Sequence, residues 1–315
     1  MNFEKLPPVT SSELMIDRAF RKAREKGIQK DLGGNWLQKI RQKEMLKLDV
    51  IKDILCSDLQ AIRLSFPVLK SLPQFYTKIV DLTLDRSLFE QALRSIGRGE
   101  KTISVLHRAT VRRIVRETER VRISAHVSEF YGRISSVMRE VKKPLQYLEE
   151  CRRVMRTYPD IKELPTVCLY GFPNVGKTTI LNQLTGTKAK VAAYAFTTKS
   201  INTGYIINNS NTIQVLDVPG TLARPEKMNR IERQAELALQ ELADVIVYVF
   251  DPSPTGGYDW KEQEKLLHKI QERKNVLIYV SKVDLLTEKE KKELPFQIYT
   301  LDQLKEKIIE LIAGK

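Results

Sequence analysis

A glycine-rich segment in the second half of the chain has the residue types and spacing of a phosphate-binding loop. Residues 171–178 fit the pattern G-x-x-x-x-G-K-[ST], with the strand-like run Val167–Tyr170 before them and the helix-like segment Lys177–Leu184 after them. The glycines let backbone N–H groups wrap a phosphate at a helix N-terminus, where the helix dipole favours an anion. Lys177 is expected to reach the β- and γ-phosphates, and the Thr178 hydroxyl is expected to ligate Mg²⁺. Nucleotide contacts are expected from Gly171, Phe172, Pro173, Asn174, Val175, Gly176, Lys177, Thr178 and Thr179.

A second segment, Asp217-Val-Pro-Gly220, follows the strand-like run Ile213–Leu216. This order places the Asp217 carboxylate at the C-terminal edge of the sheet, where ligands bind in open α/β folds. We expect Asp217 to hold Mg²⁺ through water and the Gly220 N–H to contact the γ-phosphate. Asp-x-Pro-Gly after a strand is by itself only a turn, but after a phosphate-binding loop it indicates a nucleotide switch.

A third segment, Ser281-Lys-Val-Asp284, follows the strand-like run Val276–Val280 and matches the base-reading pattern [NT]-K-x-D except at its first residue. Asp284 can accept hydrogen bonds from N1–H and from the 2-amino group of guanine, a pair of donors that adenine does not present. Lys282 is expected to pack its stem along the base. Ser281 replaces the usual Asn, whose amide normally ties this segment to the phosphate loop. The segment therefore favours GTP over ATP, but Ser281 leaves an ATPase open.

Strands and helices alternate around these segments. This order predicts a mainly parallel sheet with helices on both faces, an α/β fold whose domain begins near Leu164-Pro165 and covers residues 165–315. Besides the runs given above, the expected strands are 204–207, 245–250 and 296–299, and the expected helices are 231–242, 260–273 and 303–312.

The first half of the chain, residues 1–164, has helical periodicity and predicts an all-α bundle with up-and-down topology. The second expected helix should bury one face that carries Leu46, Val50, Ile54, Leu59 and Ile62 and should stop at Phe66-Pro67. The third expected helix should end at Gly97-Arg98-Gly99. The four expected helices are residues 11–27, the segment that stops at 66, residues 73–96, and one long helix from near 103 to 158.

Positive charge is concentrated in this helical half. Residues 1–165 contain 33 Lys and Arg against 21 Asp and Glu, whereas residues 166–315 contain 20 against 18. Such a surplus indicates a polyanionic partner, either nucleic acid or a membrane surface, and we favour RNA over the alternative of a merely lysine-rich soluble protein.

Arginines at four-residue steps form a ridge in the last expected helix. Like charges at this spacing destabilise a helix, so something should offset them. Glu117 and Glu119 could do so on a solvated, salt-bridged face; alternatively, the ridge contacts phosphates of an RNA backbone. Both interpretations remain open. The ridge consists of Arg108, Arg112, Arg116 and Arg120, with Arg113 and Arg122 beside them.

With these segments in place, the chain resembles the nucleolar GTP-binding protein (NOG) family of Obg-like P-loop GTPases. The resemblance covers residues 165–286 and rests on the segments 171–178 and 217–220, on Tyr194-Ala-Phe-Thr-Thr-Lys-Ser200, and on Gln234. It implies that Thr198 is a switch threonine that ligates Mg²⁺ and senses the γ-phosphate, within a loop that contains Phe196 and Thr197. Tyr299 and Thr300 occupy the place of a further guanine-contacting loop, although its usual motif is absent.

The resemblance also implies a role in assembling the large ribosomal subunit, with the helical domain inserted into rRNA and the GTPase domain as a timer. We expect a cytoplasmic, ribosome-associated monomer that binds GTP, GDP and Mg²⁺ and has no membrane partner. Since the chain stops at Lys315, we expect the short, archaeal-type form of the family. Two other classes stay open, namely a tRNA-directed GTPase and an RNA-binding scaffold with a nearly inactive GTPase domain.

Hydrolysis should be slow without help, because Thr221 and Leu222 stand where Ras-type enzymes place the glutamine that orients water. Related GTPases with Asn at the position of Asn174 can bind K⁺, so we expect K⁺ to stimulate hydrolysis. Arg224 and Arg230 could act instead, although they are more simply solvated switch residues. The expected catalytic set is Lys177, Thr198, Gly220 and Asn174.

Overall fold

The computed structural model describes residues 3–29, 33–186, 190–191, 201–208, 211–219, 230–253, 257–272 and 275–314. The chain divides into two compact units, each built from segments that are separated in sequence. We call them the helical unit, residues Lys5–Ser71 and Leu84–Arg156, and the sheet unit, residues Met1–Glu4, Leu72–Thr83 and Thr157–Lys315. The sequence places the domain boundary at residue 164, whereas in the structure residues 72–83 and 157–164 also belong to the sheet unit.

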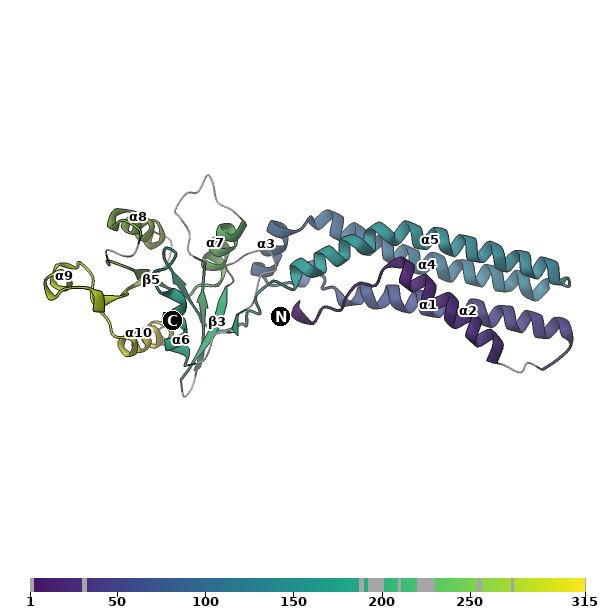
Figure 1. Cartoon of the computed structure of the whole chain (residues 1–315), viewed down its shortest axis with the longest axis horizontal. Coiled ribbons are helices and arrows are strands. Elements are labelled where there is room, and N and C mark those ends of the chain that lie inside the picture. The colour runs from purple at the N-terminus through teal and green to yellow at the C-terminus, as the bar shows by residue number, and fades with distance from the viewer. Residues whose placement is uncertain are drawn as a thin grey trace. The chain divides into compact units, whose positions relative to one another are not determined.

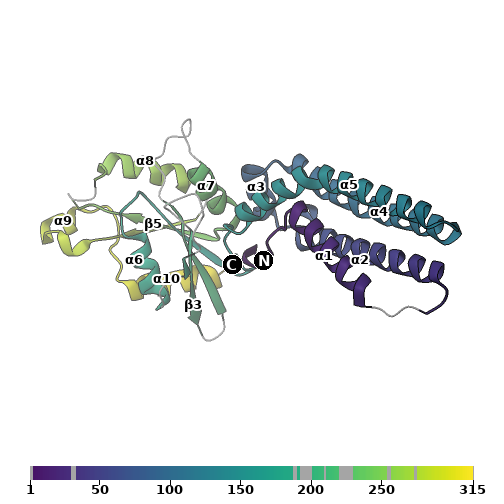
Figure 2. The same cartoon turned by 45° about the vertical axis from the view of Figure 1, so that its right-hand side comes forward.

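Long helices form the helical unit and run side by side in Figures 1 and 2. They are α1 (Ser12–Gln29), α2 (Trp36–Ser65), α4 (Arg86–Arg116) and α5 (Arg120–Met155). Consecutive helices of this set pack against each other, and α5 also contacts α1 and α2, which closes the bundle. The predicted all-α bundle is thereby confirmed. Among the described residues, no helix combines the length and apolar character that a membrane span requires.

Helix α2 buries a face that only partly matches the predicted one, since Leu59 and Ile62 are buried as expected. Its buried side chains are Leu48, Ile51, Leu55, Leu59 and Ile62. The expected Leu46, Val50 and Ile54 are only half-buried. Apolar residues at three- to five-residue steps fit two neighbouring stripes, and α2 packs against α1, α4 and α5, so both stripes are partly covered.

Glycines do not end the third predicted helix, and that prediction was wrong. The helix breaks earlier, because α3 (Gln74–Thr83) stops and the Asp85 side chain caps α4 by accepting a hydrogen bond from Leu88 N at 3.0 Å. Helix α4 then continues through Gly97 and Gly99. A Cβ at Gly99 would lie 2.9 Å from Cγ1 of Val141 on α5. This glycine therefore permits close packing of two helices rather than a turn.

The single long helix predicted from about residue 103 to 158 is also wrong, since α4 and α5 are separate antiparallel helices joined at residues 117–119. The connection contains neither Gly nor Pro, which is why the pattern gave no break. Tertiary contacts hold it instead: Arg41 Nε donates to Glu117 O at 2.9 Å, and His126 Nε2 lies 3.0 Å from Glu117 Oε1.

Within the described residues, the sheet has six strands in the order β2-β3-β4-β1-β5-β6. The pairs β1–β4, β1–β5 and β5–β6 are parallel, and β2–β3 and β3–β4 are antiparallel. The predicted, mainly parallel sheet is confirmed. The strands are β1 (Thr166–Tyr170), β2 (Lys190–Val191), β3 (Asn202–Asn208), β4 (Asn211–Asp217), β5 (Val245–Phe250) and β6 (Val276–Val280).

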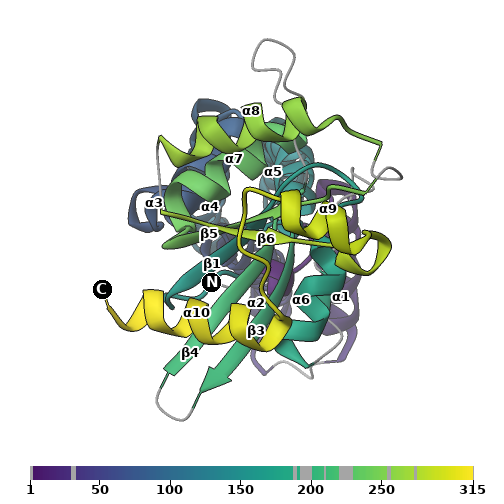
Figure 3. The ribbon, with the colours of Figure 1, turned by 90° about the vertical axis from the view of Figure 1, so that its left-hand side faces the viewer.

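Helices cover both faces of this sheet, as the end-on view of Figure 3 shows. Helices α7 (Arg230–Leu242) and α8 (Trp260–Gln271) lie on one side, and α6 (Lys177–Thr185) and α10 (Leu301–Ala313) lie on the other. A short helix, α9 (Glu288–Glu293), precedes α10 and was not predicted. The layers leave the C-terminal ends of the parallel strands free to carry loops.

The strand predicted at Phe296–Tyr299 does not form, although all four residues are described. Phe296 instead stacks on Trp260 of α8, with ring centroids 5.9 Å apart and planes 11° apart. It also contacts Phe250 at the end of β5, at a centroid distance of 5.2 Å. Its apolar character therefore reflects side-chain packing at the sheet edge and not strand pairing.

Helix α3 belongs to the sheet unit although α2 and α4, on either side of it in sequence, belong to the helical unit. It packs against α7. The buried Tyr76 hydroxyl donates to Pro159 O at 2.7 Å and accepts from Ile161 N at 2.9 Å. Burial raises the pKa of Tyr76 to about 12, so the group stays a neutral donor. Lys78 on the same helix pairs with Glu241 of α7 at 2.6 Å.

Candidate nucleotide site

The phosphate loop follows β1, whose five residues are all buried. Gly171 has φ +149°, and a Cβ there would lie 2.5 Å from the carbonyl oxygen of Val249, so only glycine fits. Gly176 has φ +93° and caps the N-terminus of α6. Asn174 adopts a left-handed conformation with φ +65°, and its side chain is exposed. The backbone thus turns sharply from strand to helix, as a phosphate loop requires.

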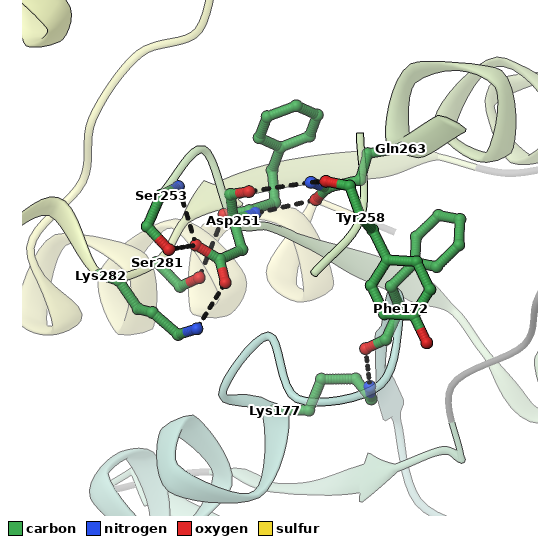
Figure 4. Close-up of polar contacts among 9 residues, drawn as sticks. Phe172, Lys177, Asp251, Ser253, Tyr258, Gln263, Ser281 and Lys282 are labelled. Atoms are coloured by element: carbon green, nitrogen blue, oxygen red, sulfur yellow. Dashed lines mark hydrogen bonds and ion pairs between the residues drawn. The ribbon is translucent and has the colours of Figure 1, made fainter. Parts of the chain in front are cut away.

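Lys177 is the first residue of α6, and its side chain folds back over the loop (Figure 4). Its Nζ donates to Gly171 O at 3.1 Å and to Phe172 O at 2.6 Å. The residue is only 7% exposed. A buried ammonium held at the mouth of the loop by carbonyl oxygens supplies positive charge where a β- or γ-phosphate would bind.

Thr178 and Asp217, the predicted Mg²⁺ ligands, meet in the structure. The Thr178 hydroxyl donates to Oδ2 of Asp217, and Asn202 Nδ2 donates to the same oxygen at 3.1 Å. Asp217 is 5% exposed, and burial raises its pKa, while Thr178, the charge of Lys177 and Asn202 oppose the rise. A carboxylate and a hydroxyl side by side are the hard oxygen donors that Mg²⁺ prefers.

Asn202 was missed by the sequence reasoning. It lies on β3 directly opposite Asp217 in the antiparallel β3–β4 pair, and it is 8% exposed. Strand register alone brings the two side chains together, and no local pattern marks that register.

The base-reading segment leaves β6 and is anchored to the neighbouring strand β5. Ser281 Oγ and Ser281 N both donate to the carbonyl oxygen of Phe250, at 3.1 and 2.8 Å. Asp284 is exposed in the short 3-10 helix Val283–Leu285. Lys282 has φ +53°, and its Nζ lies 2.5 Å from Oδ2 of Asp251.

Tyr299 and Thr300 precede α10 and make local contacts. The Tyr299 hydroxyl donates to Gln297 Oε1 at 2.9 Å. Thr300 is the N-cap of α10: its Oγ1 accepts from Gln303 N at 3.2 Å, and its own N–H donates to Gln303 Oε1 at 2.9 Å. The Thr300 hydroxyl is therefore engaged in starting a helix.

Several expected site residues lie outside the described residues. These are Phe196, Thr197, Thr198, Gly220, Thr221, Leu222 and Arg224. Their expected roles remain predictions.

The predicted arginine ridge flanks the turn between α4 and α5 because the long helix is two helices. We call Arg108, Arg112, Arg113, Arg116 and Arg120 the arginine cluster; all five are exposed. Part of it has local partners: Arg113 pairs with Glu129 at 3.1 Å, and the Arg120 guanidinium lies 5.9 Å from the centre of the Trp36 ring. No ion pair within the described part of the chain involves Arg108, Arg112 or Arg116.

Comparisons with known proteins match two successive parts of the chain to protein families. Residues 3–162 match the family described as "NOG1 N-terminal helical domain", and residues 166–282 match "50S ribosome-binding GTPase". An uncharacterized protein of Methanocaldococcus jannaschii is 32% identical over 292 residues, which cover 91% of this chain and 82% of that protein.

Curated eukaryotic relatives are longer. The nucleolar GTP-binding protein 1 of Eremothecium gossypii is 28% identical over 291 residues, and the match spans 91% of this chain but only 45% of that protein. Among solved structures, the G domain of the T. maritima FeoB iron transporter is 30% identical, with a TM-score of 0.38; the match covers 47% of this chain and 98% of that domain.

Proposed function

Because the chain belongs to the NOG family of GTP-binding P-loop GTPases, we propose that it hydrolyses GTP to GDP and phosphate as a switch in large ribosomal subunit assembly. The observation that carries this proposal is the meeting of Lys177, Thr178 and Asp217 at the C-terminal ends of β1 and β4. The names of the matched families and relatives refer to GTP binding, the nucleolus and the 50S ribosome, and they support a GTP-dependent role in ribosome assembly.

At this site, each described group has a distinct task. Lys177 would place its charge beside the β- and γ-phosphates, and backbone N–H groups of the loop would bind the same oxygens. Thr178 and Asp217 would hold Mg²⁺, which when bound neutralises phosphate charge and orients the oxygens for attack by water. Asp284 would select guanine, and Thr198 and Gly220 would complete the switch over the γ-phosphate.

Slow, K⁺-stimulated hydrolysis is part of the proposal. Asn174 is exposed and left-handed, and among the described residues no hydrogen bond holds its side chain. Its amide oxygen could therefore ligate K⁺, which would supply transition-state charge. Asn174→Gly keeps the left-handed backbone and removes the amide. Wild-type protein should turn over faster in K⁺ than in matched Na⁺ buffer, and the variant should bring that ratio close to one. Equal wild-type rates in both buffers would remove K⁺ from the mechanism.

The helical unit is proposed to dock on rRNA through the arginine cluster. Arg112 and Arg116 are exposed and carry no described ion pair, so their guanidinium groups could bind phosphates without first breaking a local contact. Arg112→Gln with Arg116→Gln should lower the slope of log affinity against log salt by about 1 to 2 for large subunits. Arg139→Gln with Lys143→Gln removes the same charge from exposed positions elsewhere on α5 and is the matched control.

Co-sedimentation with ribosomal subunits tests the switch itself. Binding to the large subunit should depend on whether GTP, GDP or a non-hydrolysable GTP analogue is present, and single-turnover hydrolysis should accelerate when large subunits are added. Nucleotide-independent binding without acceleration would instead support an RNA-binding scaffold. Equal binding to both subunits would contradict large-subunit docking.

A further inference from the structure

Asp251, a residue without an assigned role, lies directly after β5 and faces the base-reading segment (Figure 4). Its side chain is completely buried. Oδ1 accepts hydrogen bonds from Ser253 N at 3.0 Å and Ser253 Oγ at 2.6 Å. Oδ2 is directed at Lys282, whose Nζ lies 2.5 Å away. The two carboxylate oxygens thus have different tasks, one holding the turn and the other holding the lysine.

Gln263 of α8 fixes the backbone of the same residue. Its Oε1 accepts from Asp251 N at 3.0 Å, and its Nε2 donates to Asp251 O at 2.8 Å. Gln263 is itself 1% exposed. With both its main chain and one carboxylate oxygen held, Asp251 has little freedom to move, so it is a rigid anchor for whatever its second oxygen binds.

Lys282 needs such an anchor. Its left-handed backbone, at φ +53°, is disfavoured for a residue with a Cβ and has to be held by its surroundings. Its side chain is 30% exposed, so without a partner its long stem would sample many rotamers. Ser281 beside it is hydrogen-bonded to Phe250, the residue before Asp251. Ser281 and Lys282, two of the three residues between β6 and Asp284, are therefore tied to the end of β5.

The same stretch of chain also reaches the phosphate loop. The Tyr258 ring packs on Phe172, with centroids 4.5 Å apart, and Gln263 Nε2 donates to Tyr258 O at 3.3 Å. Figure 4 shows Phe172 and Lys177 below this cluster and Lys282 beside it. Tyr258, just before α8, thus contacts the phosphate-binding segment, and Asp251, just after β5, contacts the base-reading segment.

We propose that Asp251 is a positioning residue for guanine recognition: its Oδ2 holds the Lys282 stem in place beside the base and fixes the segment that presents Asp284. The proposal rests on the proposed function, in which Lys282 and Asp284 bind guanine. It gives β5 the anchoring task that an Asn at position 281 would perform through the phosphate loop. Ser281 has a shorter side chain than Asn, and its hydroxyl bonds to β5 instead.

Asp251→Asn is the direct test, because it keeps Oδ1 as an acceptor for Ser253 and removes the charge that holds Lys282. Affinity for a fluorescent GDP analogue should fall about tenfold to a hundredfold, as for the loss of one charge-assisted hydrogen bond. Competition by GTP, ITP and ATP should show a smaller preference for guanine. A variant that folds and keeps the wild-type preference overturns the proposal.

A double-mutant cycle separates positioning from general stabilisation. Lys282→Met retains most of the stem but removes the ammonium group. If Asp251 acts through Lys282, the double variant should bind the GDP analogue within about twofold of Lys282→Met alone; fully additive losses contradict the mechanism. Glu241→Gln, which breaks the Lys78–Glu241 ion pair in the same unit, is the matched control and should leave base preference unchanged.

Two further variants complete the design. Ser253→Ala removes only the hydroxyl that steadies Oδ1 and should reduce guanine preference less than Asp251→Asn does; it serves as the test if Asp251→Asn fails to fold, and an unchanged preference would then overturn the proposal. Asp284→Asn tests the proposed function separately. If Asp284→Asn abolishes guanine preference but the Asp251 and Ser253 variants keep it, only the positioning role is refuted. If Asp284→Asn has no effect, guanine recognition by this segment is refuted, and the positioning role with it.

Discussion

The Thr178 hydroxyl donates a hydrogen bond to the Asp217 carboxylate and thereby joins the first turn of α6 to the end of β4. The two residues are far apart in sequence, but α6 follows β1, and Asp217 ends β4, the parallel neighbour of β1. A metal ion held by both side chains would therefore sense the position of both segments.

Asp217→Asn should remove most of the Mg²⁺ dependence of nucleotide binding, because a neutral amide is a much weaker ligand for a hard cation. GTP turnover should fall roughly a hundredfold or more, as for the loss of one group that stabilises transition-state charge. Mg²⁺ titrations of hydrolysis and of GDP affinity measure both effects. Asp259→Asn, at an exposed position in the same unit, is the control; equal losses in the two variants would mean that the effect is not specific to the metal site.

Gly99→Ala should destabilise the helical unit. Its Cβ would approach Val141 Cγ1 to 2.9 Å, and overpacking of this kind costs about 1–3 kcal/mol. Gly132→Ala on α5 is the matched control, since nothing lies within 4 Å of its added Cβ; it should stabilise the helix by about 0.5–1 kcal/mol. Urea unfolding of both variants measures the contrast, and a stabilising Gly99→Ala would contradict the close packing of α4 on α5.

Tyr76→Phe should destabilise the sheet unit by about 1–3 kcal/mol, because it removes the two buried hydrogen bonds that the Tyr76 hydroxyl makes with Pro159 O and Ile161 N. Thermal unfolding detects the loss. Tyr299→Phe removes an exposed hydroxyl that contacts only Gln297 among the hydrogen bonds described and should change the melting temperature little. A neutral Tyr76→Phe would mean that α3 is not anchored through this hydroxyl.

Glu149 should make the stability of the helical unit depend on pH. Hydrogen bonds from Arg152, the Val9 N–H and Arg153 lower its pKa to about 2. A lowered pKa in the folded state stabilises the protein above the ordinary carboxyl pKa of 4.5, and this contribution is lost as pH falls from 4.5 towards 2. Glu149→Gln should therefore lower the melting temperature at pH 7 and have a shrinking effect below pH 4.5. Glu150→Gln, at the exposed neighbouring position, is the control and should show a smaller effect at pH 7.

The sheet and its phosphate loop could be predicted because their signals are local. Buried apolar runs mark the strands, and Gly171 to Thr178 combine a specific spacing with a strand before and a helix after. The helical unit was harder to predict because Gly97 and Gly99 lie inside α4 and do not end it, while the true turn at 117–119 is held by Arg41 of α2 and His126 of α5.

The network around Asp251 was missed for a related reason. Asp251 follows the buried strand β5 just as Asp217 ends β4, so the same rule that marked one carboxylate could have marked the other. Its contacts to Lys282 and Gln263 depend, however, on strand order and on the placement of α8. Only the folded chain brings those side chains together.

The membership of α3 in the sheet unit has a consequence for synthesis of the chain from its N-terminus. All segments of the helical unit have been made once residue 156 is added, whereas the sheet unit combines residues 72–83 with a stretch that starts at 157. During translation, α3 is therefore made well before α7, its packing partner. Helices α2 and α4, which flank α3 in sequence, can pack against each other before α7 is made. Its buried residues, Phe75, Tyr76, Ile79 and Val80, are the apolar surface that a nascent chain would expose during this interval.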